Sequence, residues 1–158
     1  MLPPLGVKPE DNTLVQSHNC FIPKKCIKKY TGHTKGVQTI ELFPQTGHLV
    51  LSASLDGTCK IWSLYDDSAE SGSTPGSGRG LRRTYSGHTE GVRSINFNQD
   101  GSRFLSSSFD RYMRLWDVET GTAVSTFGNR KMGYQAKFAP TDNNIFLMPA
   151  SDNKIYQV

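Results

Sequence analysis

The feature that most constrains this chain is a polar pattern that occurs twice at one spacing. SASLDGTCKIWS at 52–63 and SSSFDRYMRLWD at 106–117 each place an aspartate four residues after a serine and a tryptophan six residues after that aspartate. A Gly-His dipeptide precedes each stretch, at His33 and at His88. Such self-similarity is typical of repeat architectures, in which each repeat is one structural unit that stacks on its neighbours. The pattern therefore predicts repeated architecture before it predicts any chemistry.

Short apolar segments with strand character recur in the same order in both units. The first unit contains GVQTIELF, HLVLSAS and CKIW, and the second contains GVRSINF, SRFLSSS and MRLW. Segments of this length with β-branched residues favour strands, and no stretch shows a convincing helical period. QTG at 45–47 and NQDG at 98–101 supply hairpin turn chemistry between the first two segments of each unit. Each unit is expected to be an antiparallel meander.

The units are unevenly spaced, and one segment explains the difference. His33 and His88 lie 55 residues apart, whereas the next unit begins at Gly128-Asn129, 41 residues after His88. The excess of 14 residues equals the length of DSAESGSTPGSGRG at 67–80. A Ser, Gly, Pro and acid-rich segment buries too little apolar surface to offset its ordering entropy. We therefore predict a disordered insertion at 67–80, between the third and fourth strands of the first unit.

A four-stranded unit near 41 residues long, with Gly-His near its start and Trp-Asp near its end, resembles the WD40 repeat. The resemblance divides the chain into a non-repeat N-terminal segment at 1–23 and a partial propeller over 24–158, with blades at about 31–86, 87–127 and 128–158. It implies an all-β fold, a WD40 β-propeller fragment of two full four-stranded blades plus a partial third. Because propellers close with about four to eight blades, we expect a fragment in which the strand KKCIKKY at 24–30 has no partner.

The resemblance assigns the repeated polar side chains to two structural tetrads: His33, Ser52, Asp56 and Trp62, and then His88, Ser106, Asp110 and Trp116. His, Ser and Asp are also the members of a hydrolase triad. That interpretation requires an exposed serine on a strained elbow such as G-x-S-x-G, together with an oxyanion hole, and the sequence contains no such motif. We therefore expect hydrogen bonding within the blade and no catalysis by these residues.

The third unit departs from this pattern at most of its positions. Asn129, Met148 and Val158 stand where the histidine, serine and tryptophan are expected, and only Asp152 is retained. This unit is predicted to lack the polar chain.

In WD propellers one face carries the residue five past the Gly-His histidine and the residue before the tetrad aspartate. The resemblance places five residues of this chain on that face, here called the partner face: Gln38, Leu55, Arg93, Phe109 and Tyr134. An arginine beside two aromatic rings has the composition of a protein-interaction hot spot. Two alternatives remain open: the trio stacks an RNA base with Arg130 or Lys131 near a phosphate, or the two rings merely pack over a turn and a blade interface.

Composition and cysteine spacing narrow the class of function further. The chain has a net charge of +4. Its N-terminus has two early prolines and no sustained apolar run, so neither a membrane span nor a secretory signal is expected. Cys20, Cys26 and Cys59 fit neither a disulfide framework nor zinc spacing. No metal or cofactor is predicted.

Two segments carry a narrower resemblance than the generic repeat. IPKKCIKKYTGHTKGV at 22–37 and NRKMGYQAKFAP at 129–140 are similar to the start of the propeller in WD-repeat proteins of second-step pre-mRNA splicing. This resemblance implies a nuclear scaffold with spliceosomal protein partners and contact with RNA, with no membrane, small-molecule substrate or enzymatic activity. A generic WD40 adaptor, such as a ubiquitin-ligase substrate receptor or a chromatin-complex subunit, would share every blade residue and stays open as the alternative.

Overall fold

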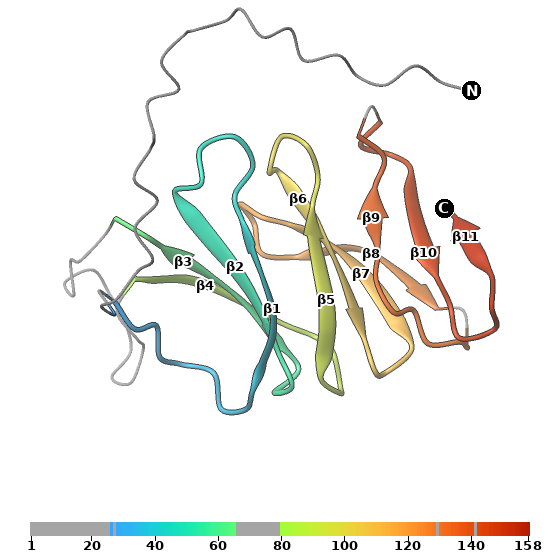
Figure 1. The fold of residues 1–158 in the computed structure, drawn as a ribbon, viewed down its shortest axis with the longest axis horizontal. Coiled ribbons are helices and arrows are strands. Elements are labelled where there is room, and N and C mark those ends of the chain that lie inside the picture. Colours follow the sequence, from blue (N-terminus) through green and yellow to red (C-terminus); the bar gives the residue numbers. More distant parts are fainter. Residues whose placement is uncertain (1–25, 27, 66–79, 129, 141) are drawn as a thin grey trace, which may run out of the picture.

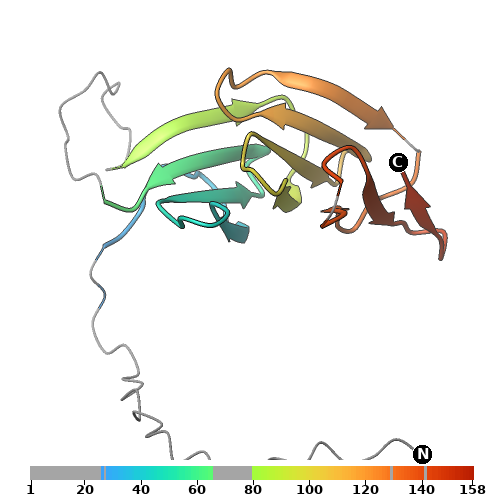
Figure 2. The ribbon, with the colours of Figure 1, turned by 90° about the horizontal axis from the view of Figure 1, so that it is seen from above.

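The computed structural model describes residues 26, 28–65, 80–128, 130–140 and 142–158. All regular structure in these residues is β, with eleven strands in three antiparallel sheets that follow one another along the chain. Figure 1 shows the three sheets side by side, and Figure 2 shows that together they follow an arc with β4 and β8 on its convex side. The prediction of an all-β propeller fragment is confirmed.

The first sheet is a meander of four strands: β1 (Val37–Leu42), β2 (Leu49–Ser54), β3 (Thr58–Ser63) and β4 (Leu81–Ser86). In the β2–β3 turn, Gly57 adopts a left-handed backbone with φ of +83°. A Cβ at this position would also lie 3.1 Å from the carbonyl oxygen of His88 in the next unit. Gly57 therefore combines a left-handed backbone with close contact between neighbouring sheets.

The second sheet repeats the first: β5 (Val92–Phe97), β6 (Arg103–Ser108), β7 (Tyr112–Asp117) and β8 (Ala123–Gly128). The repetition extends to register irregularities, since β1 and β5 both shift register after their first residue. The third sheet is shorter: β9 (Lys137–Phe138), β10 (Phe146–Pro149) and β11 (Ile155–Gln157). The repeat seen in the sequence is thus a repeat of strand pairing.

The apolar core lies between successive sheets. Ten buried residues form the first cluster: Leu51, Ala53, Cys59, Ile61, Tyr85, Val92, Ile95, Phe97, Phe104 and Trp116. Five more fill the space between the second and third sheets: Leu105, Met113, Ala136, Phe146 and Met148. Because each unit buries its apolar face against the next, the units stabilise one another in series.

A line of hydrogen bonds also joins the strands β1, β5 and β9. The Glu41 carboxylate accepts hydrogen bonds from the Asn96 side-chain amide at 2.9 Å and from the Phe97 backbone N–H at 3.0 Å. The Asn96 side-chain oxygen in turn accepts from the Phe138 N–H at 2.9 Å. Glu41 and Asn96 both stand eight residues after a Gly-His histidine, so the same position bridges each pair of sheets.

Two expectations about the segments around the sheets need comment. The N-terminal segment 1–23 and the predicted disordered insertion lie outside the described residues, apart from the last residue of that insertion. This residue, Gly80, is held in a turn where its carbonyl accepts from the Ser63 N–H at 2.7 Å. The insertion does fall between the third and fourth strands of the first sheet.

The strand expected at 24–30 is not formed in its described part. Cys26 and residues 28–30 belong to no strand. Instead, Lys28 Nζ donates to the Leu64 carbonyl at 3.3 Å, and the Tyr30 ring packs edge-on against Trp62 at a centroid distance of 5.7 Å. A strand is defined by its ladder, and the described residues contain no strand that pairs with this segment, for which the sequence analysis expected no partner.

Candidate functional site

The structure brings the four members of each predicted tetrad into one hydrogen-bonded chain. In the first unit, Trp62 Nε1 donates to Ser52 Oγ at 2.8 Å, Ser52 Oγ lies 2.8 Å from His33 Nε2, and His33 Nδ1 lies 2.8 Å from Asp56 Oδ2. The corresponding distances in the second unit are 2.8, 2.7 and 2.8 Å. Residues from two neighbouring strands, the turn between them and the Gly-His loop thus meet at the same geometry twice.

The direction of each hydrogen bond in the tetrad follows from its two terminal residues, because the tryptophan indole can only donate and the ionised aspartate can only accept. A neutral histidine next to a carboxylate carries its proton on Nδ1, which leaves Nε2 as an acceptor for the serine hydroxyl. The serine oxygen then accepts from the indole N–H, so every polar group between tryptophan and aspartate is paired. The aspartate goes on to accept backbone N–H groups, Thr34 and Thr58 in the first unit.

A Ser-His-Asp arrangement with these distances resembles a hydrolase triad, but the environment of the serine differs. Ser52 is 4% exposed and Ser106 is fully buried, each beneath the indole that donates to it. A nucleophilic serine must reach a carbonyl carbon of its substrate. Neither hydroxyl can do so in this position, so the arrangement ties the Gly-His loop to the strands and is not suited to nucleophilic attack.

Two serines that the sequence analysis missed belong to the same network. Ser54 Oγ donates to the carbonyls of Lys35 and Gly36, both at 3.1 Å, and accepts from the Asp56 N–H at 3.2 Å. Ser108 repeats these contacts with Glu90, Gly91 and Asp110. Each serine stands two residues before its aspartate in both repeats, and this repeated S-x-D spacing is the signal that would have identified them.

The third unit uses a different partner for its aspartate. Met148 is buried at the serine position, and Val158 stands at the tryptophan position. Asp152 Oδ2 accepts a hydrogen bond from the Tyr156 hydroxyl on β11. The described part of the unit therefore lacks the indole–serine link, as its sequence predicts, and Tyr156 satisfies only one oxygen of the retained carboxylate, since Asp152 Oδ1 is buried without a hydrogen-bond partner. Asn129 lies outside the described residues.

Burial and hydrogen bonding shift the pKa values of the tetrad in a consistent direction. Desolvation lowers the pKa of His88, partly offset by Asp110. Desolvation alone would raise the pKa of Asp110, but hydrogen bonds from the Tyr112 N–H, His88 and the Thr89 N–H outweigh it and lower that pKa. The pKa of Asp56 is lowered in the same way by Thr58, His33 and Thr34. In the second unit the folded state thus favours a neutral His88 beside an ionised Asp110.

We expect the free energy of unfolding to decrease as the pH is lowered from 7. Below about 6.5, the ordinary pKa of histidine, the unfolded chain protonates His88 before the folded chain does, so stability falls. The contributions of Asp56 and Asp110 are present above about 3.9 and are lost as the pH falls through their lower folded pKa values. Melting temperatures measured from pH 7 to pH 3 would test this. A flat profile between pH 7 and 5 would contradict the His88 component.

The variant His88→Gln provides the control for the His88 component. In this variant the melting temperature should change less with pH just below 6.5, while the decrease at lower pH that comes from the aspartates should remain. Glu41 contributes with the opposite sign. Desolvation raises its pKa despite hydrogen bonds from Phe97 and Asn96, so its effect is to reduce stability as the pH rises through the folded value.

Three of the five residues predicted for the partner face contact one another in the structure. The Arg93 guanidinium carbon lies 4.6 Å from the Tyr134 ring centroid and 5.8 Å from that of Phe109. Arg93 and Phe109 come from the second unit and Tyr134 from the third, so the three residues, here called the Arg93 platform, bridge two units. Cation–π contacts at such distances favour a fixed arginine.

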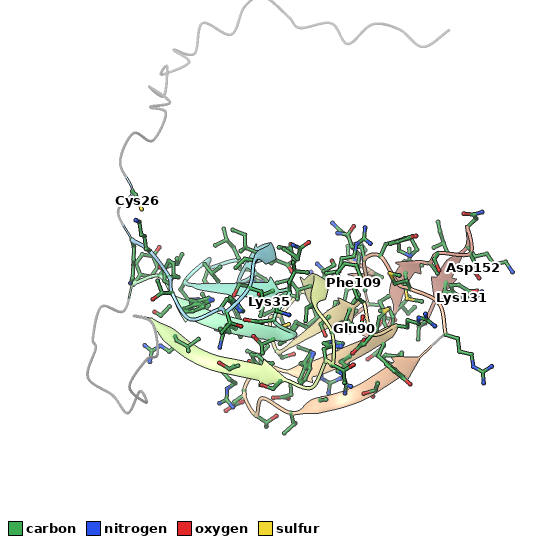
Figure 3. The ribbon with its side chains drawn as sticks, turned by 90° about the horizontal axis from the view of Figure 1, so that it is seen from below. Cys26, Lys35, Glu90, Phe109, Lys131 and Asp152 are labelled. Carbon is green, nitrogen blue, oxygen red and sulfur yellow. The ribbon has the colours of Figure 1, made fainter. Side chains whose placement is uncertain are left out.

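The other two predicted residues, Gln38 and Leu55, make no described contact with this platform. Gln38 is exposed on β1. Leu55 is 36% exposed and packs over Gly91, where an added Cβ would lie 2.9 Å from its side chain. Figure 3 views this face and labels Lys35, Glu90 and Phe109 on its loops.

Neither a metal-binding cluster nor a membrane-spanning helix lies in the part of the chain that the structure describes. No group of three or more His, Cys, Asp or Glu side chains there is placed to hold a metal ion. No helix in the same residues has the length and apolar character needed to cross a membrane.

Sheets with this repeated tetrad define a WD-repeat β-propeller protein. The family described as WD domain, G-beta repeat matches residues 24–63 and 79–117, and the chain belongs to this family. It is 45% identical to Pre-mRNA-processing factor 17 of Mus musculus over 145 residues, which cover 90% of this chain and 23% of that protein. Identity to Pre-mRNA-processing factor 17 of Homo sapiens is also 45%, over 140 residues that cover 87% of this chain and 22% of that protein.

These identities confirm the narrower resemblance predicted from the sequence. The chain spans about a quarter of the length of the curated relatives it matches. Among solved structures, the β-propeller domain of Cps50 (Swd1) from Myceliophteria thermophila matches with a TM-score of 0.66 at 21% identity, covering 80% of this chain and 36% of that chain. At this identity the likeness shows the fold alone.

Proposed function

We propose that this chain is a non-catalytic protein-interaction scaffold of the pre-mRNA splicing machinery and acts in the nucleus, in the second step of splicing. The observation that carries the proposal is the 45% identity to Pre-mRNA-processing factor 17 across 90% of the chain. The tetrads support the non-catalytic part, because their serines are buried under tryptophan. The partners we propose are spliceosomal proteins, together with contact to RNA.

The Arg93 platform is the part of the partner face that best suits such a contact. Tyr134 is 40% exposed, and Arg93 and Phe109 are half-buried beside it. A guanidinium held between two rings offers a large contact area with little side-chain entropy left to lose on binding. Arg130 and Lys131 are exposed in the loop that leads to Tyr134, which places positive charge beside the platform.

Affinity purification of the tagged full-length protein from nuclear extract tests the functional class. Co-recovery of small nuclear RNAs and splicing proteins is the expected result. Recovery of cullin or of chromatin-complex subunits in their place would instead identify the generic WD40 adaptor and overturn the splicing proposal.

The double substitution of Arg93→Ala and Phe109→Ala tests the platform. We expect recovery of the partners to fall about tenfold, which corresponds to ~1.4 kcal/mol and is modest for a hot spot. The matched control is Arg103→Ala with Tyr65→Ala, which removes an exposed arginine and an aromatic residue that is 79% exposed. Melting temperatures are measured in parallel. Full partner recovery by a folded platform variant would exclude this face, and loss of the fold would show that the residues are core.

A further inference from the structure

The two interfaces between the three sheets share an aromatic pair and differ at the position of the tryptophan. Between the first and second sheets, the rings of Tyr85 and Phe104 pack edge-to-face at 4.8 Å, and Trp116 lies 5.8 and 6.2 Å from them. Between the second and third sheets, Phe127 and Phe146 repeat the edge-to-face pair at 5.2 Å. The residue six positions after the aspartate, which is Trp116 in the second unit, is Val158 in the third. The aromatic pair is thus kept, but its third ring is absent.

A cavity of about 450 Å³ lies beside this second pair. Val158 lines it, and its inner wall is formed by Phe127, Phe146, Met113 and Met148. Both methionines and Phe146 are buried, so the wall is a continuation of the core. Methionine side chains adapt their shape and make favourable sulfur–aromatic contacts. The volume lies in the range of ligand pockets, and its lining suits an apolar or aromatic group.

The lining of this cavity also carries positive charge. Arg111, from the β6–β7 turn, and Lys131, from the loop between the second and third units, both line it and are exposed. Arg111 also lines a neighbouring groove together with Arg130. None of the described residues that line the cavity is acidic. An occupant that places an apolar ring inside and negative charge at the mouth would complement both features.

We propose that this cavity binds a peptide segment of a partner protein in which an aromatic side chain is flanked by acidic residues. The ring fills the place of the absent tryptophan, between the Phe127–Phe146 pair and the two methionines. The flanking carboxylates pair with Arg111 and Lys131, whose charge-assisted hydrogen bonds orient the segment. RNA fits less well, because a base would bury polar edges against a wall of Phe and Met that offers them few hydrogen-bond partners.

The direct test uses the methionine methyl groups of the full-length protein as reporters. The probe is a synthetic peptide with one Trp between Asp and Glu residues, and its controls replace the Trp with Ala or the acids with Lys. We expect the Trp ring to shift the ¹³C-methyl signals of Met113 and Met148, while the signal of Met1 is unchanged. Absence of shifts, equal binding of the Ala peptide, or stronger competition by an oligouridylate would each overturn the proposal.

Val158→Trp is the matching variant, since it restores the side chain of the other two repeats and fills the cavity. Peptide affinity should fall at least about tenfold, a loss of ~1.4 kcal/mol, without a lower melting temperature. Lys131→Glu should weaken binding about fivefold or more, a change typical of one charged contact, whereas Lys35→Glu makes the same charge change on the first unit and should leave it unaltered. Figure 3 shows these two lysines at separate places on this side of the molecule. Wild-type affinity in a folded Val158→Trp protein would exclude the cavity.

Discussion

Phe104→Ala is expected to lower the free energy of unfolding by about 3–5 kcal/mol, because it removes a large ring from a closely packed core. Phe104 is fully buried on β6. Its ring contacts Tyr85 and Trp116 and also packs edge-to-face with Phe97 at 6.1 Å. Since Tyr85 belongs to the first sheet, the deletion leaves a cavity in the interface that joins two units. Chemical denaturation of the full-length protein, with folding followed by circular dichroism, measures the change.

The control for this prediction is Tyr65→Ala. Tyr65 is also aromatic, but its side chain is 79% exposed, so the change in stability should stay within about 0.5 kcal/mol. A loss of less than about 1 kcal/mol for Phe104→Ala would mean that the interface collapses around the missing ring or that the sheets are not coupled through it.

The strands and turns within each unit could be predicted from the sequence, whereas the contacts between units could not. The strands and the β1–β2 and β5–β6 turns follow from short apolar segments bounded by Asn, Asp and Gly, which act within a few residues. The importance of Phe104 follows instead from its position between two sheets, and its neighbours in sequence, Arg103 and Leu105, do not reveal it. The Glu41 bridge is of the same kind, since its partners lie 55 and 56 residues away.

The candidate sites show the same division. The tetrad residues were identified because one spacing occurs twice, and their side chains meet as the resemblance to WD repeats implies. The segment at 24–30 forms no strand in its described part, because a strand needs a ladder and the sequence analysis already expected this segment to have no partner. The cavity beside Phe127 exists because Val158 is smaller than the tryptophan of the other repeats. The sequence shows this substitution, but the resulting space can be recognised only once the position of the neighbouring sheet is known. Tyr156 was missed because no equivalent tyrosine stands at that position in the other units, where Lys60 and Arg114 occur.

Asp110→Ala should destabilise the protein by about 1 to 3 kcal/mol, because its carboxylate is the last acceptor of a buried chain. The side chain is 3% exposed and accepts from His88 Nδ1 at 2.8 Å. It also accepts from the backbone N–H groups of Thr89 at 3.2 Å and Tyr112 at 2.9 Å. Alanine leaves these donors without their acceptor and frees the Gly-His loop from the β6–β7 turn. The melting temperature of the full-length protein measures the loss.

The third unit supplies an internal comparison for this prediction. Asp152 holds the equivalent position but accepts from the Tyr156 hydroxyl in place of a histidine, so Asp152→Ala should destabilise less than Asp110→Ala. Glu119→Ala, which removes an exposed carboxylate, should have little effect. Asp110→Asn separates charge from hydrogen bonding, since an amide oxygen still accepts from His88 and should recover part of the loss. If Asp110→Ala melts at the wild-type temperature, the tetrad does not stabilise the sheet, and its repetition along the chain needs another physical cause.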